Sequence, residues 1–259
     1  MIQSTLMFRK VFRFMGRVIC GRFIPHRAYP VLCGPLRGAK FILGSLAGDG
    51  GGASVYLNGI EPEQTHIFQE TVKPGNILFD IGANVGYYTL LGSHLVGNSG
   101  RVIAFEPVIQ NLSYLEQHVR LNRLRNVMII SAACADSNSL AKLCSGTNCA
   151  TGHLSDPSQD VGSYQADDSV YVPALTVDEF VVKSGLVPNV IKIDVEGAEL
   201  RVLKGAQQTV LSRKPKIFLS VHSSELRSTC LDYLQQRGYS VRPLDGDVSH
   251  AGEYLSCAD

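Results

Sequence analysis

Several features that identify common classes of protein are absent from this chain of 259 residues. No acidic residue precedes Asp49, whereas lysine and arginine recur throughout that segment. The seven cysteines have no CxxC spacing, which argues against a zinc site or a disulfide framework and favours free thiols. No apolar run approaches the roughly 18 residues needed to span a bilayer. Arg13, Arg17 and Arg22 interrupt the apolar positions near the start, so no secretory signal is expected and a cytoplasmic location is predicted.

Two nucleotide-binding motifs are also missing. The chain contains neither a GxGxxG segment nor a GxxxxGKS or GxxxxGKT segment, so nicotinamide and triphosphate ligands lose their usual support. The net charge of +1 gives no general argument for a nucleic-acid partner, and none is expected. A nicotinamide oxidoreductase stays only as a competing class, to be tested by the absorbance of bound reduced cofactor.

Residues 1–60 are predicted to be a basic extension that precedes the main domain. Within it, residues 6–23 place apolar side chains at helical spacing with arginines on another face. This amphipathic helix has two interpretations. It could dock on the domain or on a second subunit as a dimer contact, or lie on an anionic membrane surface as a peripheral anchor. Ser54 to Asn58 is predicted to be a short strand.

Strands and helices alternate through residues 61–259, the pattern of a parallel sheet with helices on both faces. The last two apolar segments, 239–243 and 253–257, are predicted to close the sheet as an antiparallel hairpin. The polar stretch 137–174 is predicted to be a loop or hairpin insertion at the carboxyl edge. The expected fold is therefore α/β, a Rossmann-like class I methyltransferase with a seven-stranded, mostly parallel sheet.

The most informative segment is a short apolar strand, 77–81, followed by a glycine-containing turn and a helical pattern from Val85. Gly82 and Gly86 remove Cβ atoms, so a ligand could lie against the main chain at the start of a helix. Asp80 at the strand's end would repel a pyrophosphate but suits a cationic amino-acid group. The sign of that charge favours S-adenosylmethionine over a dinucleotide.

Two further acids are candidates for the same cofactor. Glu106 ends the next strand, 101–105, and should face the same crevice as the glycine turn, where a carboxylate accepts both ribose hydroxyls. Asp136, just after the third strand, 127–132, could accept a hydrogen bond from an adenine amino group. An ordinary turn residue explains Asp136 almost equally well.

A second segment, 190–199, contains several charged residues close together and includes the candidate catalytic residues. Lys192 and Asp194 share one face of a predicted central strand, so they must pair or open onto a polar pocket. Glu196 follows at the carboxyl edge, where it would otherwise be a first-turn acid of the next helix. His222 ends the neighbouring strand and could remove the proton from an attacking hydroxyl, or cap a helix. With the two acids it could alternatively hold a divalent metal, but none is assigned.

Together these segments resemble the FkbM-type methyltransferases. The likeness is carried by residues 79–89, 104–107, 175–180, 191–199 and 202–206. It extends over about residues 62–243 and implies an S-adenosylmethionine-dependent enzyme that O-methylates sugars, glycolipids or polyketide-derived hydroxyls. The resemblance implies cofactor contacts at Asp80, Gly82, Ala83, Asn84, Gly86 and Glu106. It places the substrate pocket around Lys192, Asp194, Glu196 and His222.

The sequence thus predicts a methyltransferase whose partner is a small-molecule hydroxyl acceptor. Asp194 or Glu196 would orient the acceptor, and His222 is the expected base. Two alternatives stay open: a methyltransferase acting on nucleic acid or protein, and a non-catalytic protein that binds S-adenosylmethionine.

Overall fold

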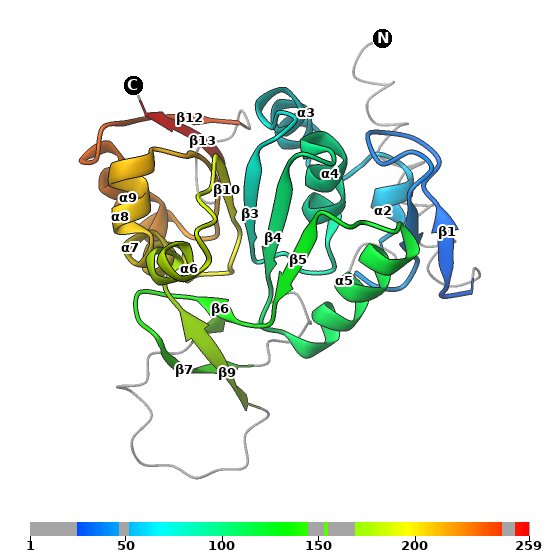
Figure 1. The fold of residues 1–259 in the computed structure, drawn as a ribbon, viewed down its shortest axis with the longest axis horizontal. Helices are drawn as coiled ribbons and strands as arrows, with labels where there is room; N and C mark the ends of the chain where they lie inside the picture. The colour runs from blue at the N-terminus through cyan, green and yellow to red at the C-terminus, as the bar shows by residue number, and fades with distance from the viewer. Residues whose placement is uncertain (1–24, 47–51, 145–152, 155–168, 245–251, 259) are drawn as a thin grey trace.

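A computed structural model describes residues 25–46, 52–144, 153–154, 169–244 and 252–258 (Figure 1). The predicted helix over 6–23 lies outside these residues. No helix in the described ranges is both long and apolar enough to cross a membrane. Cys33, Cys134, Cys230 and Cys257, which fall within them, are free thiols.

The centre of the molecule is a seven-stranded sheet in the order β12-β13-β11-β10-β3-β4-β5. The strands are β3 (Ile77–Ile81), β4 (Arg101–Phe105), β5 (Val127–Ile130), β10 (Val190–Ile193), β11 (Lys216–Val221), β12 (Tyr239–Pro243) and β13 (Gly252–Ala258). β11, β10, β3, β4 and β5 pair in parallel, whereas β13 runs antiparallel between β11 and β12. The predicted Rossmann-like, seven-stranded and mostly parallel sheet with an antiparallel terminal hairpin is confirmed.

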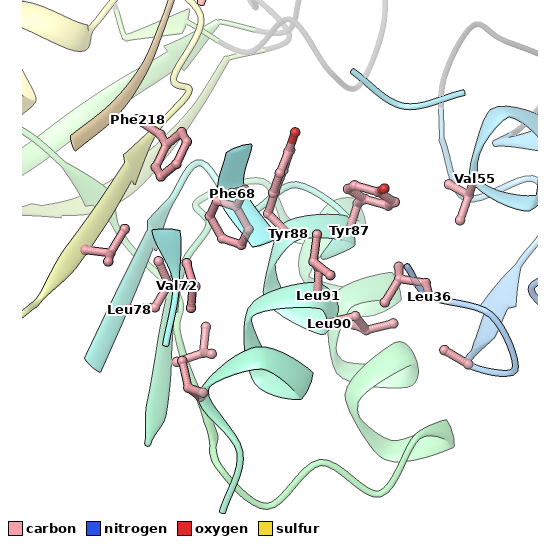
Figure 2. Packing of buried hydrophobic residues seen from close by; sticks show 14 of the residues in the cluster. Leu36, Val55, Phe68, Val72, Leu78, Tyr87, Tyr88, Leu90, Leu91 and Phe218 are labelled. Atoms are coloured by element: carbon pink, nitrogen blue, oxygen red, sulfur yellow. The ribbon is translucent and has the colours of Figure 1, made fainter. Parts of the chain in front are cut away.

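Helices cover both faces of this sheet because its strands alternate apolar side chains between the two faces. On one face Leu78 and Phe218 pack with Phe68 of α3 (Pro62–Thr71) and Leu90 of α4 (Tyr87–Val96), as Figure 2 shows. Next to them α5 (Ile109–Leu121) buries Leu115.

The opposite face of the sheet carries a second apolar cluster built around Phe79 and Ile191. It is covered by α6 (Val177–Ser184), α7 (Glu199–Gly205), α8 (Gln207–Arg213) and α9 (Ser224–Gln235). Figure 1 shows these four helices grouped on the side of the sheet away from α3, α4 and α5. Two covered faces leave the strand ends as the accessible edge of the sheet.

Smaller sheets flank the core. β1 (Ala28–Pro30) and β2 (Lys40–Ile42) form an antiparallel pair near α5. The region predicted as an insertion contains β7 (Ser139–Cys144), β8 (His153–Leu154) and β9 (Ser169–Leu175), joined to β6 (Ala133–Cys134) in a four-stranded sheet.

The strand predicted over Ser54 to Asn58 is wrong, because this segment forms the short helix α2 (Ala53–Tyr56). Val55 is 2% exposed and packs in the same apolar cluster as Leu36. No pairing between strands involves this segment in the described part of the chain. Packing therefore overrides the strand preference of Val55 and Tyr56.

Candidate active site

The candidate site lies where the direction of strand addition reverses. From β3 the chain proceeds outward through β4 and β5, whereas from β10 it proceeds the other way to β11. β3 and β10 are neighbours, and Asp80 is directly opposite Lys192 in their register. In open α/β sheets, ligands bind beyond the carboxyl ends of the strands at such a reversal.

A hollow of about 640 Å³ opens at these carboxyl ends. Its lining includes Gly82, Asn84, Glu106, Asn111, Asp194 and Glu196. The lining thus comes from the turns after β3, β4 and β10, which are separate in the sequence. A ligand in this hollow would touch both halves of the sheet.

Glu106 is a buried carboxylate on one wall of this hollow. One of its oxygens accepts the backbone N–H of Asn84 at 2.7 Å, and the other accepts that of Val108 at 2.9 Å. Burial raises the pKa of Glu106, although these hydrogen bonds oppose the shift. A carboxylate oxygen has two lone pairs, so the oxygen bound to Asn84 retains capacity for a ligand hydroxyl.

An adjoining hollow of about 480 Å³ shares Gly82, Asn84 and Asp194 with the first and also contains Asp80. Asp80 is 1% exposed, and its Oδ2 accepts the hydroxyl of Thr89 at 2.6 Å. Its Oδ1 is buried without a hydrogen-bond partner among the described residues. Burial raises the pKa of Asp80, against the opposing charge of Lys192. An unsatisfied buried acceptor beside a hollow fits the ammonium group of a bound amino acid.

Lys192 forms part of the lining of the second hollow. Its Nζ donates to Oδ2 of Asp194 at 2.8 Å and lies 4.6 Å from the ring centre of Tyr88. The Tyr88 hydroxyl in turn donates to Glu61 at 2.7 Å. Burial alone would lower the pKa of Lys192, but Asp194 and Asp80 raise it overall, so the ammonium stays charged. This ion pair offsets the free-energy cost of burying both charged groups in a central strand.

Asp194, Glu196 and His222 converge at the rim of the larger hollow. Nε2 of His222 lies 3.4 Å from Oδ1 of Asp194 and 3.6 Å from Oε2 of Glu196. On its other side, Nδ1 of His222 lies 2.8 Å from Oε1 of Glu199, which is fully buried. Glu199 is therefore a fourth member of this cluster.

The charge of this cluster determines the state of the imidazole. Burial alone would lower the pKa of His222, but the hydrogen bond to Glu199 and the charges of Asp194 and Glu196 raise it to about 9. Burial also raises the pKa of Glu196, partly offset by His222. These acids therefore favour the protonated form of the imidazole, and the role of His222 as the base stays a prediction.

Most residues singled out from the sequence meet at this reversal, but two do not. Gly86 lines neither hollow: it is the N-cap of α4, and a Cβ there would lie 2.5 Å from Cδ1 of Leu115. Ala83, in contrast, lines the second hollow. Asp136 lines neither hollow and forms an ion pair with Arg201 at 3.0 Å. Arg201 is thus a partner of Asp136 in the structure, and its contact with an adenine amino group stays a prediction.

Two acids in the site received no role from the sequence. Glu61 precedes α3, and no periodic pattern connects it with the strands that follow. Glu199 belongs to the dense segment after β10, where a third acid close to Asp194 and Glu196 was a usable signal. Both reach the site through contacts that depend on the assembled fold.

A family model described as the methyltransferase FkbM domain matches residues 80–241. The match covers more than half of the chain, including the turns after β3, β4, β10 and β11. The chain therefore belongs to the FkbM methyltransferase family, and its cofactor is S-adenosylmethionine.

Individual proteins resemble the chain more distantly. The hexuronic acid methyltransferase AglP of Haloferax volcanii is 28% identical over 159 residues, which are 59% of this chain and 59% of that protein. A solved FkbM methyltransferase from Methylobacillus flagellatus is 20% identical, with a TM-score of 0.49 over 82% of this chain and 56% of that one. Fibrillarin from Aeropyrum pernix, solved with S-adenosyl-L-methionine, is 18% identical, with a TM-score of 0.43 over 71% and 68%.

Proposed function

We propose that this protein transfers the methyl group of S-adenosylmethionine to a hydroxyl of a sugar or sugar acid. The observation that carries the proposal is that two different sites adjoin where the direction of strand addition reverses. A buried acidic hollow adjoins a cluster of side chains that could orient a hydroxyl. The resemblance to a hexuronic acid methyltransferase supports a carbohydrate acceptor.

In this proposal the cofactor extends across the two hollows. Its ribose would hydrogen-bond to Glu106, and its ammonium group would meet the unsatisfied oxygen of Asp80. Asp194 borders both hollows, so the sulfonium methyl would lie near the cluster of Asp194, Glu196 and His222. Glycines in the intervening turn allow the ligand to approach the backbone.

Methyl transfer needs the acceptor oxygen and the methyl carbon in line, so positioning supplies much of the rate. The carboxylates of Asp194 and Glu196 would accept the hydroxyl hydrogen bond. The imidazole of His222, whose Nε2 lies 3.4 and 3.6 Å from these two acids, would contact the same acceptor and help to orient it.

The acceptor can be found by supplying methyl-labelled S-adenosylmethionine with a panel of hexuronates, hexoses and their glycosides. Mass spectrometry should find a methyl ether on a sugar hydroxyl and none on added nucleic acid or protein. Label appearing on nucleic acid or protein instead would support the second class of acceptor. Binding of S-adenosylhomocysteine without transfer to any acceptor would indicate a non-catalytic binding protein.

The cofactor site can be tested separately with Asp80→Asn. The amide keeps the shape and the Thr89 contact but removes the charge, so S-adenosylhomocysteine should bind about 10-fold to 100-fold more weakly by calorimetry. Asp178→Asn is the matched control, because Asp178 accepts backbone N–H groups of Gln208 and Thr209 and lines neither hollow. Equal affinities for both variants and the wild type would remove Asp80 from the cofactor site.

A further inference from the structure

Asp194, Glu196 and His222 bring three metal-ligand atoms together. These atoms all lie within 4.8 Å of one another, and their side chains are 26%, 35% and 33% exposed. The 3.4 and 3.6 Å separations from Nε2 exceed the usual hydrogen-bond range of about 2.7–3.2 Å. They are close to the roughly 3.0–3.4 Å between adjacent ligands of an ion bound at about 2.1–2.4 Å. The three atoms therefore face one another across a space of ionic size.

Two of the three side chains are held in place by hydrogen bonds to residues outside this group. Glu199 accepts from Nδ1 of His222 at 2.8 Å, which directs Nε2 towards the carboxylates. Lys192 holds Oδ2 of Asp194 at 2.8 Å, which leaves Oδ1 on the side of the histidine. Histidines that ligate metals almost always donate their other ring N–H to a carboxylate, carbonyl or water.

The local charge also favours a cation. Glu199 is fully buried, and its Oε2 has no hydrogen-bond partner among the described residues. With Asp194 and Glu196 it forms a group of three carboxylates around His222, and Lys192 pairs with one of them, Asp194. Asp80, opposite Lys192 in the sheet, adds a fourth carboxylate. A divalent cation would remove this excess of negative charge.

We propose that Asp194, Glu196 and His222 bind a divalent cation of the Mg²⁺ or Mn²⁺ type beside the cofactor hollow. Carboxylate oxygens suit these ions, and the partial exposure of all three ligands leaves coordination positions open for water or an acceptor oxygen.

The role of the ion rests on the proposed function. Bound to the acceptor hydroxyl, the cation would make its proton easier to lose to water. The oxygen then bonds to the methyl carbon. The carbon–sulfur electrons remain on sulfur, and S-adenosylhomocysteine leaves.

Titration with Mn²⁺, followed by the electron paramagnetic resonance signal of the free ion, tests the site on the full chain. The wild type should bind one Mn²⁺ in competition with Mg²⁺, and His222→Gln and Glu196→Gln should each weaken binding at least 10-fold. A matched control is His66→Gln, from an exposed His66–Glu70 pair 3.5 Å apart on α3, which should bind like the wild type. Absence of a saturable site in the wild type, or equal binding by all variants, would overturn the proposal.

Glu199→Gln tests the positioning residue, because it leaves all three ligands in place. Mn²⁺ affinity should fall about 10-fold to 100-fold, while calorimetric affinity for S-adenosylhomocysteine stays unchanged. If the buried substitution alters thermal unfolding, the more exposed Glu196→Gln still decides whether the cation site exists. Unchanged Mn²⁺ affinity in a folded Glu199→Gln protein would contradict the positioning role.

These measurements separate the cation site from the proposed function, because Mn²⁺ binding needs neither cofactor nor acceptor. Mn²⁺ binding without transfer to any acceptor would reject the function and keep the site. Full transfer in EDTA by a protein that binds no Mn²⁺ would reject the site and keep the function.

Discussion

Gly82 lies where the turn after β3 meets the backbone that leaves β10. Its φ is +80°, and a Cβ at this position would lie 1.8 Å from the carbonyl oxygen of Asp194. The amide of Asp194 also donates to the carbonyl of Ile81 at 3.0 Å. Close contact between the turn after β3 and the backbone at Asp194 therefore requires a residue without a side chain.

Gly82→Ala should lower the free energy of unfolding by more than about 2 kcal/mol, measured by urea denaturation, because backbone must move as well as adopt a positive φ. Gly185→Ala is the matched control. Gly185 also has a positive φ, +70°, but a Cβ there meets nothing within 4 Å. Its cost should be only about 1 kcal/mol. Equal losses in the two variants would show that the approach to Asp194 is not limiting.

At the level of single residues, the sequence could predict those that lie next to strand ends. Asp80, Glu106, Asp194 and His222 were found because parallel strands end at one edge. Glu61 was not found, since it reaches the site through the hydroxyl of Tyr88, a residue that the helical pattern marked only as apolar. The raised pKa of His222 was equally inaccessible, because it depends on a contact with Glu199 formed only by folding.

Among the secondary-structure elements, β2 is held to the outer side of α5 by a buried histidine. Nε2 of His118 accepts the backbone N–H of Ile42 at 2.9 Å, and its Nδ1 lies 2.7 Å from the carbonyl of Val85. Its ring stacks on Phe41 at 4.0 Å between centroids. Asn122 adds two hydrogen bonds to the backbone of Lys40. The imidazole joins the strand pair to the helix in its neutral form.

Burial lowers the pKa of His118 from 6.5 to about 4, although the Val85 hydrogen bond opposes the shift. Between these values the unfolded chain binds more protons than the folded one, so stability should fall as the pH falls. The contribution is about 3 kcal/mol between pH 7 and pH 4. Urea denaturation of His118→Gln should therefore show a weaker loss over this range than the wild type.

Asn122→Ala provides the matched control for this contact between β2 and α5. It removes neighbouring hydrogen bonds without removing a titratable group, so it should lower stability at every pH and leave the pH dependence as in the wild type. A His118→Gln protein with the same pH dependence as the wild type would disprove the role of the histidine.

The regular elements of the central sheet were predictable, and those that depend on distant contacts were not. The strands 77–81, 101–105 and 190–193 coincide with short apolar runs. Such runs indicate buried strands whichever strands pair with them. The β1–β2 pair was not predicted, because each strand has only three residues and contacts with α5 hold the pair in place. α2 was misassigned for the same reason, since its conformation follows from packing.

For the molecule as a whole, a ligand at the reversal should connect the two halves of the sheet. Hydrogen exchange with and without S-adenosylhomocysteine should show slower exchange at 80–88 and 104–111, and also at 194–199. The lining of the hollows comes from all three segments. The β12–β13 hairpin, which lines neither hollow, serves as the internal control. Protection confined to 80–88 and 104–111 would show that the ligand contacts only one half.

The pairing of β3 with β10 also constrains how the chain acquires its site during synthesis. The side chain of Asn189 accepts the amide of Ile77 across 112 positions, and the intervening chain contains β4, β5 and the flanking sheet. When β3 to β5 have been synthesised, the turn after β3 is already present, but β10, the neighbour of β3 in the sheet, is not. The edge of β3 stays open until β10 emerges, so the nascent protein passes through an interval in which that edge is available to the wrong strand.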